Sequence, residues 1–436
     1  MFTGIFGKAG LAKESVKGTF VEPTKFMRFI PPFQFSRDIE LIISQGISGL
    51  ADMVTKVAQG AAALKSGKIN FEVEPEGGLG EHLNAIFGTD TVTETANFTV
   101  TLNANDTIDF TEDGGLEVSA VLTPGTYAMG ASSAVAGSLC KLIKDQMEAA
   151  NGTAATYTVT YSYTTKKLTI TKDSGVFVFK WATGTNTAKS AKTLLGFTNA
   201  DTASAIAATS DSTTGNFIMS HAFSRLANAE LPTYSWWQKN GANYPQFAGC
   251  ALNSLEFDIK AKEFVIASAD WAGLKYEAGG TDKTSSFSAK QPFKFNQAAL
   301  TVGGSSVKDY EEVKIKFADN VDLLHVIGDG IDASKSYSKG TMVTISASMI
   351  VENTTEWDKF IAGTASSFAF AITGSELAGG VTPFSLAFDI PEVYYQAAPI
   401  PIGNDLIKIA FTAVAKYNVA AGYTAKATLV NNEAQY

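Results

Sequence analysis

Apolar and polar residues alternate along most of the chain, which is the pattern of strands that bury one face. In residues 68–74, Ile69, Phe71 and Val73 alternate with charged or amide side chains, and Pro75 follows. The same alternation returns after residue 216. It predicts further strands at residues 255–260, 264–271, 313–317, 342–351, 367–373, 384–390, 405–414 and 422–430. We therefore expect a β-rich body.

Two short helices interrupt these strands. Residues 79–87 carry apolar side chains at i, i+4, i+7 and i+8, the stripe of an amphipathic helix, and Gly88 stands where a helix C-terminal glycine is expected. A second helix of one or two turns begins at Thr354 or Thr355, either of which can cap it, and ends before Gly363.

The composition changes near residue 92, and the chain stays rich in Thr, Ala, Ser and Asn to about residue 212. We interpret residues 93–212 as a small inserted α+β domain, and residues 1–92 and 213–436 as a discontinuous body. Within the insert the pattern predicts strands at 97–103, 116–122 and 176–181, a hairpin over 157–170, helices at 132–149 and 187–195, and a polar linker at 202–215.

Two regions fit no clean period. The first thirty-odd residues contain many glycines and prolines, which favours an arm or irregular loop, although a packed N-terminal strand is an equal alternative. Phe26 and Phe29 there need burial, either in the chain or against another subunit. Residues 38–67 are apolar and sparsely charged, and they match neither a helix nor a strand.

The overall composition excludes several classes of protein. Of 436 residues, 45% are hydrophobic and 18% are charged, with a formal net charge of −9. A disordered chain would be less hydrophobic, and a nucleic-acid-binding protein would normally carry a basic excess. A low charge fraction is compatible with extensive subunit contacts, because the centres of interfaces are depleted in charge.

The rarer residues narrow the chemistry further. Two cysteines, Cys140 and Cys250, exclude a disulfide scaffold and a cysteine-based zinc cluster; two buried thiols are favoured over one bridge. No two histidines are spaced as metal ligands on one helix. We expect no membrane insertion, because no apolar run reaches the length of a membrane helix, and the first residues lack a signal-peptide core.

Several short motifs resemble parts of known sites, but each lacks an element that its chemistry needs. For Trp236 and Trp237, a packed loop or subunit anchor is favoured over a stacking platform for sugars or bases. We therefore expect no catalytic residue, cofactor or metal, and no enzyme. The other motifs are a glycine-rich turn at Gly77–Gly80, an oxygen-rich segment at Asn103–Asp109, an SxxK spacing at Ser336 and Lys339, and a His221–Ser224 pair.

The body resembles the tail tube proteins (major tail proteins) of long-tailed bacteriophages. The resemblance rests on segments in a matching order: AKESVKGTFVEPTKFMRFIPP at 12–32, the stretch 42–60, KINFEVEPEGGLGEHLNAIFG at 68–88, AGCALNSLEFDIKAKEFVIASADWAG at 248–273 and PFKFNQAALTVGG at 292–304. The insert resembles a different module, found in several virion proteins, through LTPGTYAMG, TYTVTYSYTTKKLTIT and FVFKWATGTNTAKSAKTLLGF.

The resemblance implies a β-sandwich or barrel body that forms rings, usually of six subunits, stacked into a hollow tube in the virion. It implies contacts with a tape measure protein and with tail terminator and baseplate proteins, transient passage of DNA, and synthesis in the host cytoplasm. An N-terminal arm and a long loop reach adjacent rings in such proteins. The matching candidate contacts here are Phe26, Phe29, Ile42, Ile43, Leu50 and Met53. The insert is expected to project outward.

The negative charge fits this role, because a lumen that presents carboxylates offers DNA phosphates few cations to bind. Glu256 and Asp258, on the polar face of a predicted strand, are candidates for that lining; a solvated outer face is the alternative. Two other functions stay open. One is another virion structural role, as a decoration or baseplate component, and the other is a glycan-binding adhesive role of the insert.

Overall fold

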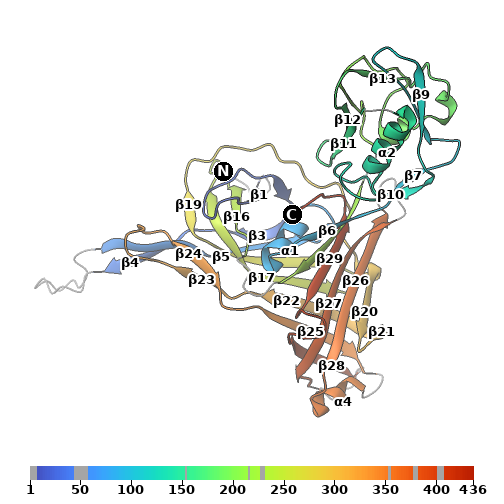
Figure 1. Ribbon diagram of the computed structural model, residues 1–436. Coiled ribbons are helices and arrows are strands. Elements are labelled where there is room, and N and C mark those ends of the chain that lie inside the picture. Colours follow the sequence, from blue (N-terminus) through green and yellow to red (C-terminus); the bar gives the residue numbers. More distant parts are fainter. Residues whose placement is uncertain are drawn as a thin grey trace, which may run out of the picture.

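The computed structural model describes residues 7–43, 57–152, 155–214, 217–225, 231–351, 355–376, 382–399 and 407–436. Within these residues the fold is mainly β. A β-sandwich body carries a small α+β unit at one end, and a long hairpin projects from the other end (Figure 1). The predicted fold class is confirmed.

Two antiparallel sheets form the sandwich. In spatial order the first sheet contains β6 (Thr91–Thr95), β15 (Ile218–Ser224), β29 (Lys426–Asn431), β27 (Pro383–Ala397), β26 (Ser366–Glu376), β20 (Ala298–Val302) and β21 (Ser305–Val307). The second contains β5 (Val57–Glu72), β18 (Ile266–Gly273), β17 (Gln246–Lys260), β22 (Tyr310–Ala318), β25 (Met342–Ile350) and β28 (Lys408–Ala415).

Two long strands each belong to two sheets. Strand β27 pairs with β26 and β29 through its first half and with β28 through Val393–Ala397, so it joins the first sheet to the second. Strand β17 pairs with β18 and β22 through its second half and with β16 (Tyr234–Lys239) and β19 (Lys275–Glu277) through its first. Gly249, in that first half, has φ +68°, and a Cβ there would lie 2.6 Å from a methyl carbon of Leu274, so the position requires glycine.

The N-terminal segment forms the rest of a third, smaller sheet. Strand β1 (Lys8–Lys13) lies between β16 and β2 (Lys25–Met27). Ala9, Leu11 and Ala12 of β1 are buried. Of the two alternatives for this region, the packed strand is therefore correct for residues 8–13 and 25–27, and the irregular loop is correct for residues 14–24 between them.

The stretch that fitted no period is a hairpin. Strand β4 (Asp38–Ile43) pairs with the first half of β5, while β3 (Ile30–Gln34) pairs with its second half. Five of the six residues of β4 are exposed, so the strand has two wet faces and no alternation to detect. A second hairpin, β23 (Val321–Leu324) and β24 (Lys335–Ser338), lies beside it, joined where the Ala62 N–H donates to the carbonyl of Ile331 at 2.7 Å.

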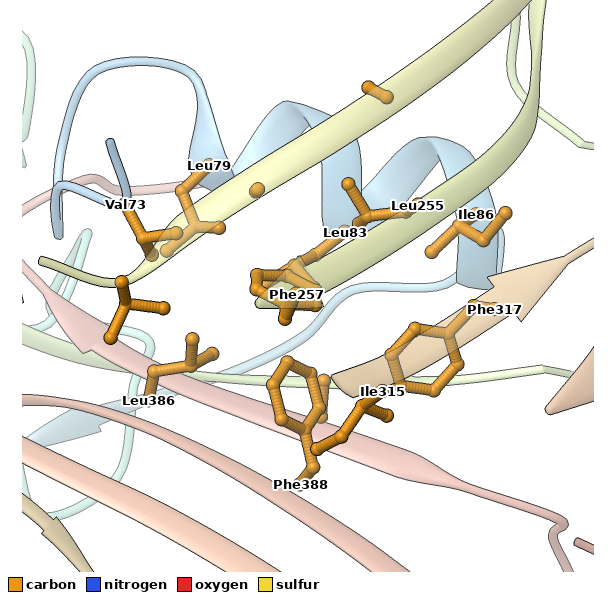
Figure 2. Packing of buried hydrophobic residues seen from close by; sticks show 14 of the residues in the cluster. Val73, Leu79, Leu83, Ile86, Leu255, Phe257, Ile315, Phe317, Leu386 and Phe388 are labelled. Carbon is orange, nitrogen blue, oxygen red and sulfur yellow. The ribbon is translucent and has the colours of Figure 1, made fainter. Parts of the chain in front are cut away.

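Helix α1 (Leu79–Phe87) has the bounds that the sequence predicts, and Gly88 closes it in the left-handed conformation. Leu79, Leu83 and Ile86 pack between the two sheets, against side chains such as Phe257 and Phe388 (Figure 2). The expected wet face is wrong, however, because every residue of α1 is buried. Its polar side chains need partners inside the body.

The aromatic ring of Tyr436 covers the start of α1. A Cβ on Gly80 would lie 2.0 Å from Cζ of this ring, which shows how closely the two residues pack. The Tyr436 N–H donates to Asp90 at 3.0 Å, and its carbonyl accepts from Nζ of Lys13 at 2.8 Å. Tyr436 therefore ties β1, α1 and β29 together.

The α+β unit has its own hydrophobic core, which contains Trp181, Phe110 and Ile143 among its buried residues. Strands β6 and β15 lead the chain into and out of it, and they pair with each other. The domain boundaries at 92/93 and 212/213 stay a prediction. Its elements are β7 (Phe98–Val100), β8 (Thr107–Glu112), β9 (Glu117–Val121), β10 (Gly125–Tyr127), α2 (Leu139–Asn151), β11 (Tyr157–Ser162), β12 (Lys167–Lys172), β13 (Phe177–Phe179), the 3₁₀ turn Thr187–Lys189, α3 (Lys192–Leu195) and β14 (Ala207–Thr209).

Several sequence predictions inside this unit are wrong, including the helix at 187–195, which is a 3₁₀ turn followed by the short α3. Helix α2 starts at Leu139 rather than 132, because Ser138 caps it by accepting from the Lys141 N–H at 3.1 Å. Strand β8 was not predicted; its Asp109 is buried and accepts from the Asn186 N–H at 2.6 Å. The expected polar linker contains β14, which pairs with β12.

The last elements of the body follow the sequence prediction closely. Helix α4 (Thr355–Ala362) ends before Gly363, which has φ +61°. A 3₁₀ turn at Phe295–Gln297 precedes β20. The predicted strands that follow residue 250 are present, but β17 begins at Gln246 instead of 255 and β27 continues to Ala397 instead of 390. The start of the strand predicted at 405–414 lies outside the described residues.

A double-mutant cycle tests the packing of Tyr436 on α1. Tyr436→Ala is expected to cost about 3 kcal/mol, since it removes a buried aromatic ring. Gly80→Ala alone is expected to cost about 1–3 kcal/mol through overpacking. In the Tyr436→Ala background the same change becomes neutral or stabilises by up to about 1 kcal/mol, because alanine is the better helix former. Denaturant unfolding of the four proteins measures the coupling. Additive costs would contradict the contact.

Candidate assembly surfaces

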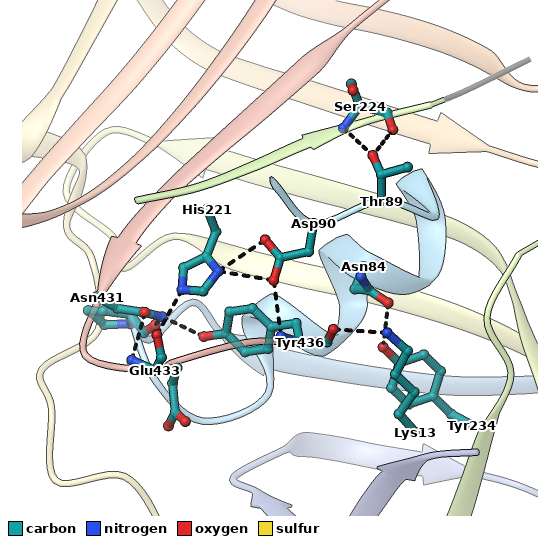
Figure 3. A network of polar contacts seen from close by, with 11 residues as sticks. Lys13, Asn84, Thr89, Asp90, His221, Ser224, Tyr234, Asn431, Glu433 and Tyr436 are labelled. Carbon is teal, nitrogen blue, oxygen red and sulfur yellow. Dashed lines mark hydrogen bonds and ion pairs between the residues drawn. The ribbon is translucent and has the colours of Figure 1, made fainter. Parts of the chain in front are cut away.

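The His221–Ser224 pair is not a nucleophile and base. The buried His221 ring places Nδ1 3.0 Å from Oδ1 of Asp90 and Nε2 2.9 Å from the carbonyl of Glu433 (Figure 3). Ser224 instead forms main-chain hydrogen bonds with the Thr89 hydroxyl. Both ring nitrogens therefore form hydrogen bonds that join β15 to Asp90, directly before β6, and to Glu433, after β29.

The other motifs also have structural roles. Trp236 and Trp237 are buried in β16, in a strand rather than a loop, so they present no stacking platform at the surface. Gly78 closely approaches the side chain of Met27, which leaves no room for a phosphate at that turn. Nζ of Lys339 lies 2.6 Å from a carboxylate oxygen of Asp322. This lysine is therefore paired with a carboxylate and is not arranged to activate Ser336 as a nucleophile.

The oxygen-rich segment contains a turn, and both thiols are buried. Asp106 accepts from the Asn103 N–H at 2.8 Å, so Asn103–Asp106 is a turn. Cys140 and Cys250 are unpaired and buried, as expected for reduced thiols, and burial raises the pKa of both. In the described ranges, no three His, Cys, Asp or Glu side chains are grouped to hold a metal ion. No helix there is long and apolar enough to cross a membrane.

The projecting hairpin carries the most conspicuous apolar surface. We call the following set the hairpin patch, with exposed fractions of 42–62%: Ile39, Leu41, Ile42, Ile43 and Val57. Ile43 pairs with Val57 across the strands, so the patch covers both strands. Leu41, Ile43 and Val57 share one face of the hairpin, and Ile42 lies on the other face. Exposed apolar side chains gathered on a projection mark an interaction site.

The neighbouring hairpin β23–β24 extends this surface. Its tip carries Val326 and Ile327, and Ile327 is fully exposed. The Arg37–Asp332 ion pair, at 2.8 Å, joins this tip region to the segment before β4. The two hairpins therefore form one protrusion with apolar side chains on both.

The predicted contact residues differ widely in how much surface they offer. Ile42 and Ile43 are exposed, whereas Phe26 is only 8% exposed and packs edge-on against Trp237 with ring centroids 6.0 Å apart. Phe29 is half-buried beside Phe33. Phe26 is thus already buried within its own chain and offers little surface to another subunit. Leu50 and Met53 lie outside the described residues, and the role of all six stays a prediction.

Glu256 and Asp258 lie on the outer face of the second sheet, which we call the charged face. Asp258 pairs with Nζ of Lys260 at 2.9 Å and of Lys314 at 3.6 Å, and Glu312 accepts from the same two lysines. Glu256 stands opposite Lys316 in the register. These carboxylates raise the pKa of Lys260 and Lys314, which stay charged. The face is mixed in charge rather than purely acidic.

Helix α1 brings titratable groups into the interior. Burial raises the pKa of Glu81 to about 7, and Oε2 of this carboxyl has no hydrogen-bond partner in the described structure. Burial lowers the pKa of the adjacent His82 to about 4, opposed by a hydrogen bond between Nδ1 and the Gly78 carbonyl. At pH 7 His82 is therefore neutral, whereas the Glu81 carboxyl is close to its midpoint and becomes neutral as the pH falls below 7.

A comparison with protein families gives one match over most of the chain. A family model described as phage tail tube protein matches residues 7–415, which include the whole body to the end of β28 and the α+β unit. No curated protein matches the chain.

The pKa of Glu81 predicts a pH dependence of stability. Its folded value of about 7 lies above the ordinary 4.5, so the contribution is present below pH 4.5 and is lost as the pH rises through 7. Glu81→Gln removes this dependence. The variant should gain up to about 3 kcal/mol on the wild type between pH 4.5 and 8.

Denaturant unfolding at several pH values measures this difference. The lowered pKa of His82 acts in the opposite direction, because it stabilises the fold as the pH rises from 4 to 6.5. Both proteins contain His82, so its contribution to the free energy of unfolding cancels when they are compared at each pH. Glu72→Gln, at an exposed position of β5, is the control and should show a flat difference. A flat difference for Glu81→Gln as well would contradict the burial of a neutral carboxyl.

Proposed function

Because the chain belongs to the phage tail tube protein family, we propose that six copies form a ring and that rings stack into a hollow tube. The tube conducts phage DNA to the host during ejection. It contacts the tape measure protein inside and the tail terminator and baseplate proteins at its ends. The protein is made in the host cytoplasm and ends in the virion. The observation that carries the proposal is the family match over residues 7–415.

The hairpin patch supports self-association. Its five apolar side chains project from the body into solvent, where they are unfavourable until another surface covers them. In a tube, every copy has neighbours that supply such a surface.

The charged face is suited to line the lumen because its lysines are already paired with carboxylates, and not because the face is purely acidic. Each of Lys260 and Lys314 is engaged by two carboxylates, so a DNA phosphate finds cations that are already neutralised. DNA then gains little by adhering to the wall. We propose that this face, with Glu256 and Asp258, lines part of the lumen.

The α+β unit is proposed to point away from the tube axis. It has a separate hydrophobic core and joins the body at one end, through the paired strands β6 and β15 and the packing of Ala434 (Figure 1). A unit of this size inside the lumen would obstruct DNA. We propose residues 93–212 as this accessory domain, and its removal should leave tube formation intact.

Charging the hairpin patch tests assembly. The double variant Ile42→Asp, Ile43→Asp is expected to abolish tubes in negative-stain images and to leave a folded, dispersed protein, because buried unpaired carboxylates oppose docking. Circular dichroism checks the fold. Leu116→Asp is the matched control, since Leu116 is 90% exposed in the α+β unit. Tubes of normal length from the double variant would exclude the hairpin from assembly.

Releasing the lysines tests the lumen. Asp258→Asn with Glu312→Gln leaves Lys260 and Lys314 without these partners, so assembled tubes should bind short DNA duplexes more tightly, with a steeper salt dependence. The control is Asp145→Asn with Glu148→Gln, which frees two lysines on α2. Co-sedimentation with labelled DNA measures binding. If DNA binding increased equally in both double variants, the charged face would be no more accessible to DNA than α2. That result would contradict its placement in the lumen.

A further inference from the structure

A groove opens between the two sheets of the body, away from the projecting hairpin. Its volume is about 530 Å³, within the range of pockets that hold a bound group. We call it the sheet groove. Its apolar lining comes from both sheets: Ile259, Leu300, Val307, Val313 and Phe370.

The groove exists because the sandwich is not closed on this side. Strand β21 pairs with β20, with Val307 opposite Leu300, and no further strand pairs with β21 among the described residues. On the other side, β27 and β28 join the sheets. An open sandwich edge with an apolar interior is a surface that another segment tends to cover.

The hairpin patch and the sheet groove lie on opposite sides of the body. Strands β20 and β21 are on the side away from β4 (Figure 1). Ring formation uses heterologous interfaces, in which two different surfaces of each copy meet. The apolar projection on one side of the body and the apolar groove on the other side are two such different surfaces.

The charges around the two surfaces are also compatible. Glu40 and Lys65 form an ion pair next to the hairpin patch. The groove rim carries both signs as well, with Lys308 beside Glu311. Neither surface therefore presents a single sign of charge that would repel the other.

We propose that the sheet groove of one copy receives the hairpin patch of a neighbouring copy. Leu41 and Ile43, on one face of the hairpin, cover Leu300 and Val307 and extend the contact over the open edge of β21. This inference rests on the proposed function, since it takes as given that the chain assembles with itself, and it identifies the two surfaces that meet.

Cross-linking in assembled tubes tests this pairing directly. The native Cys140 and Cys250 are buried, so a short bismaleimide reacts with introduced cysteines. Tubes of the variant Ile43→Cys, Val307→Cys should give a ladder of covalent multimers on a denaturing gel. Each single variant should give no ladder, and neither should the pair Leu116→Cys, Val307→Cys.

The outcomes separate this inference from the proposed function. Tubes without a ladder would overturn the pairing and leave tube formation in place. A ladder from the Leu116→Cys pair equal to that of the hairpin pair would overturn it too. Absence of tubes from the wild-type protein would instead refute the proposed function.

A mixing experiment covers the case in which the cysteine variants do not assemble. The hairpin variant Ile42→Asp, Ile43→Asp keeps its groove, and Val307→Asp keeps its hairpin. Each alone should stay dispersed, while an equal mixture should form dimers that stop growing, about tenfold more than either alone. Ultracentrifugation measures this. No dimers in the mixture, or equal dimers in each protein alone, would contradict a head-to-tail contact.

Discussion

The body depends on two strands that each serve two sheets. Through β17 and β27 the hydrogen bonds of three sheets are continuous, so the interior closes around α1 with few free edges. Burial of α1 follows from this arrangement, because sheets lie on more than one side of the helix. The same arrangement encloses Glu81 and His82. Burial disfavours their charged forms, which raises the pKa of Glu81 and lowers that of His82.

Much of this fold could be predicted where burial is one-sided. Strands such as β22 and β25 alternate because one face is buried and the other is wet, and α1 was found with its bounds and its glycine cap. The errors occur where this contrast fails. β4 is wet on both faces, β16 is almost wholly buried, and Asp109 in β8 is a buried carboxylate satisfied by hydrogen bonds. A periodicity argument has no signal in such strands.

The assembly surfaces were predicted less well than the fold. The resemblance to tail tube proteins makes Ile42, Ile43 and Phe26 candidate contacts; Ile42 and Ile43 are exposed, whereas Phe26 is buried inside the chain. Net charge suggested acidic residues at Glu256 and Asp258, but it says nothing about neighbours across strands. The register places lysines of β22 opposite them, which only tertiary structure reveals. The sheet groove has no sequence signature, because its lining residues are ordinary core residues of strands far apart in the chain.

An exposed apolar projection is unfavourable for a chain that remains alone, and this cost has a consequence for assembly. The hairpin patch shares no core with the rest of the body, so changes to its side chains affect association far more than folding. The interior cluster around α1 has the opposite character, since its groups contact nothing outside the body. The residues that keep each copy folded are thus separate from those that we propose join copies. In the proposed assembly, a folded copy therefore joins the polymer without unfolding any element of the body.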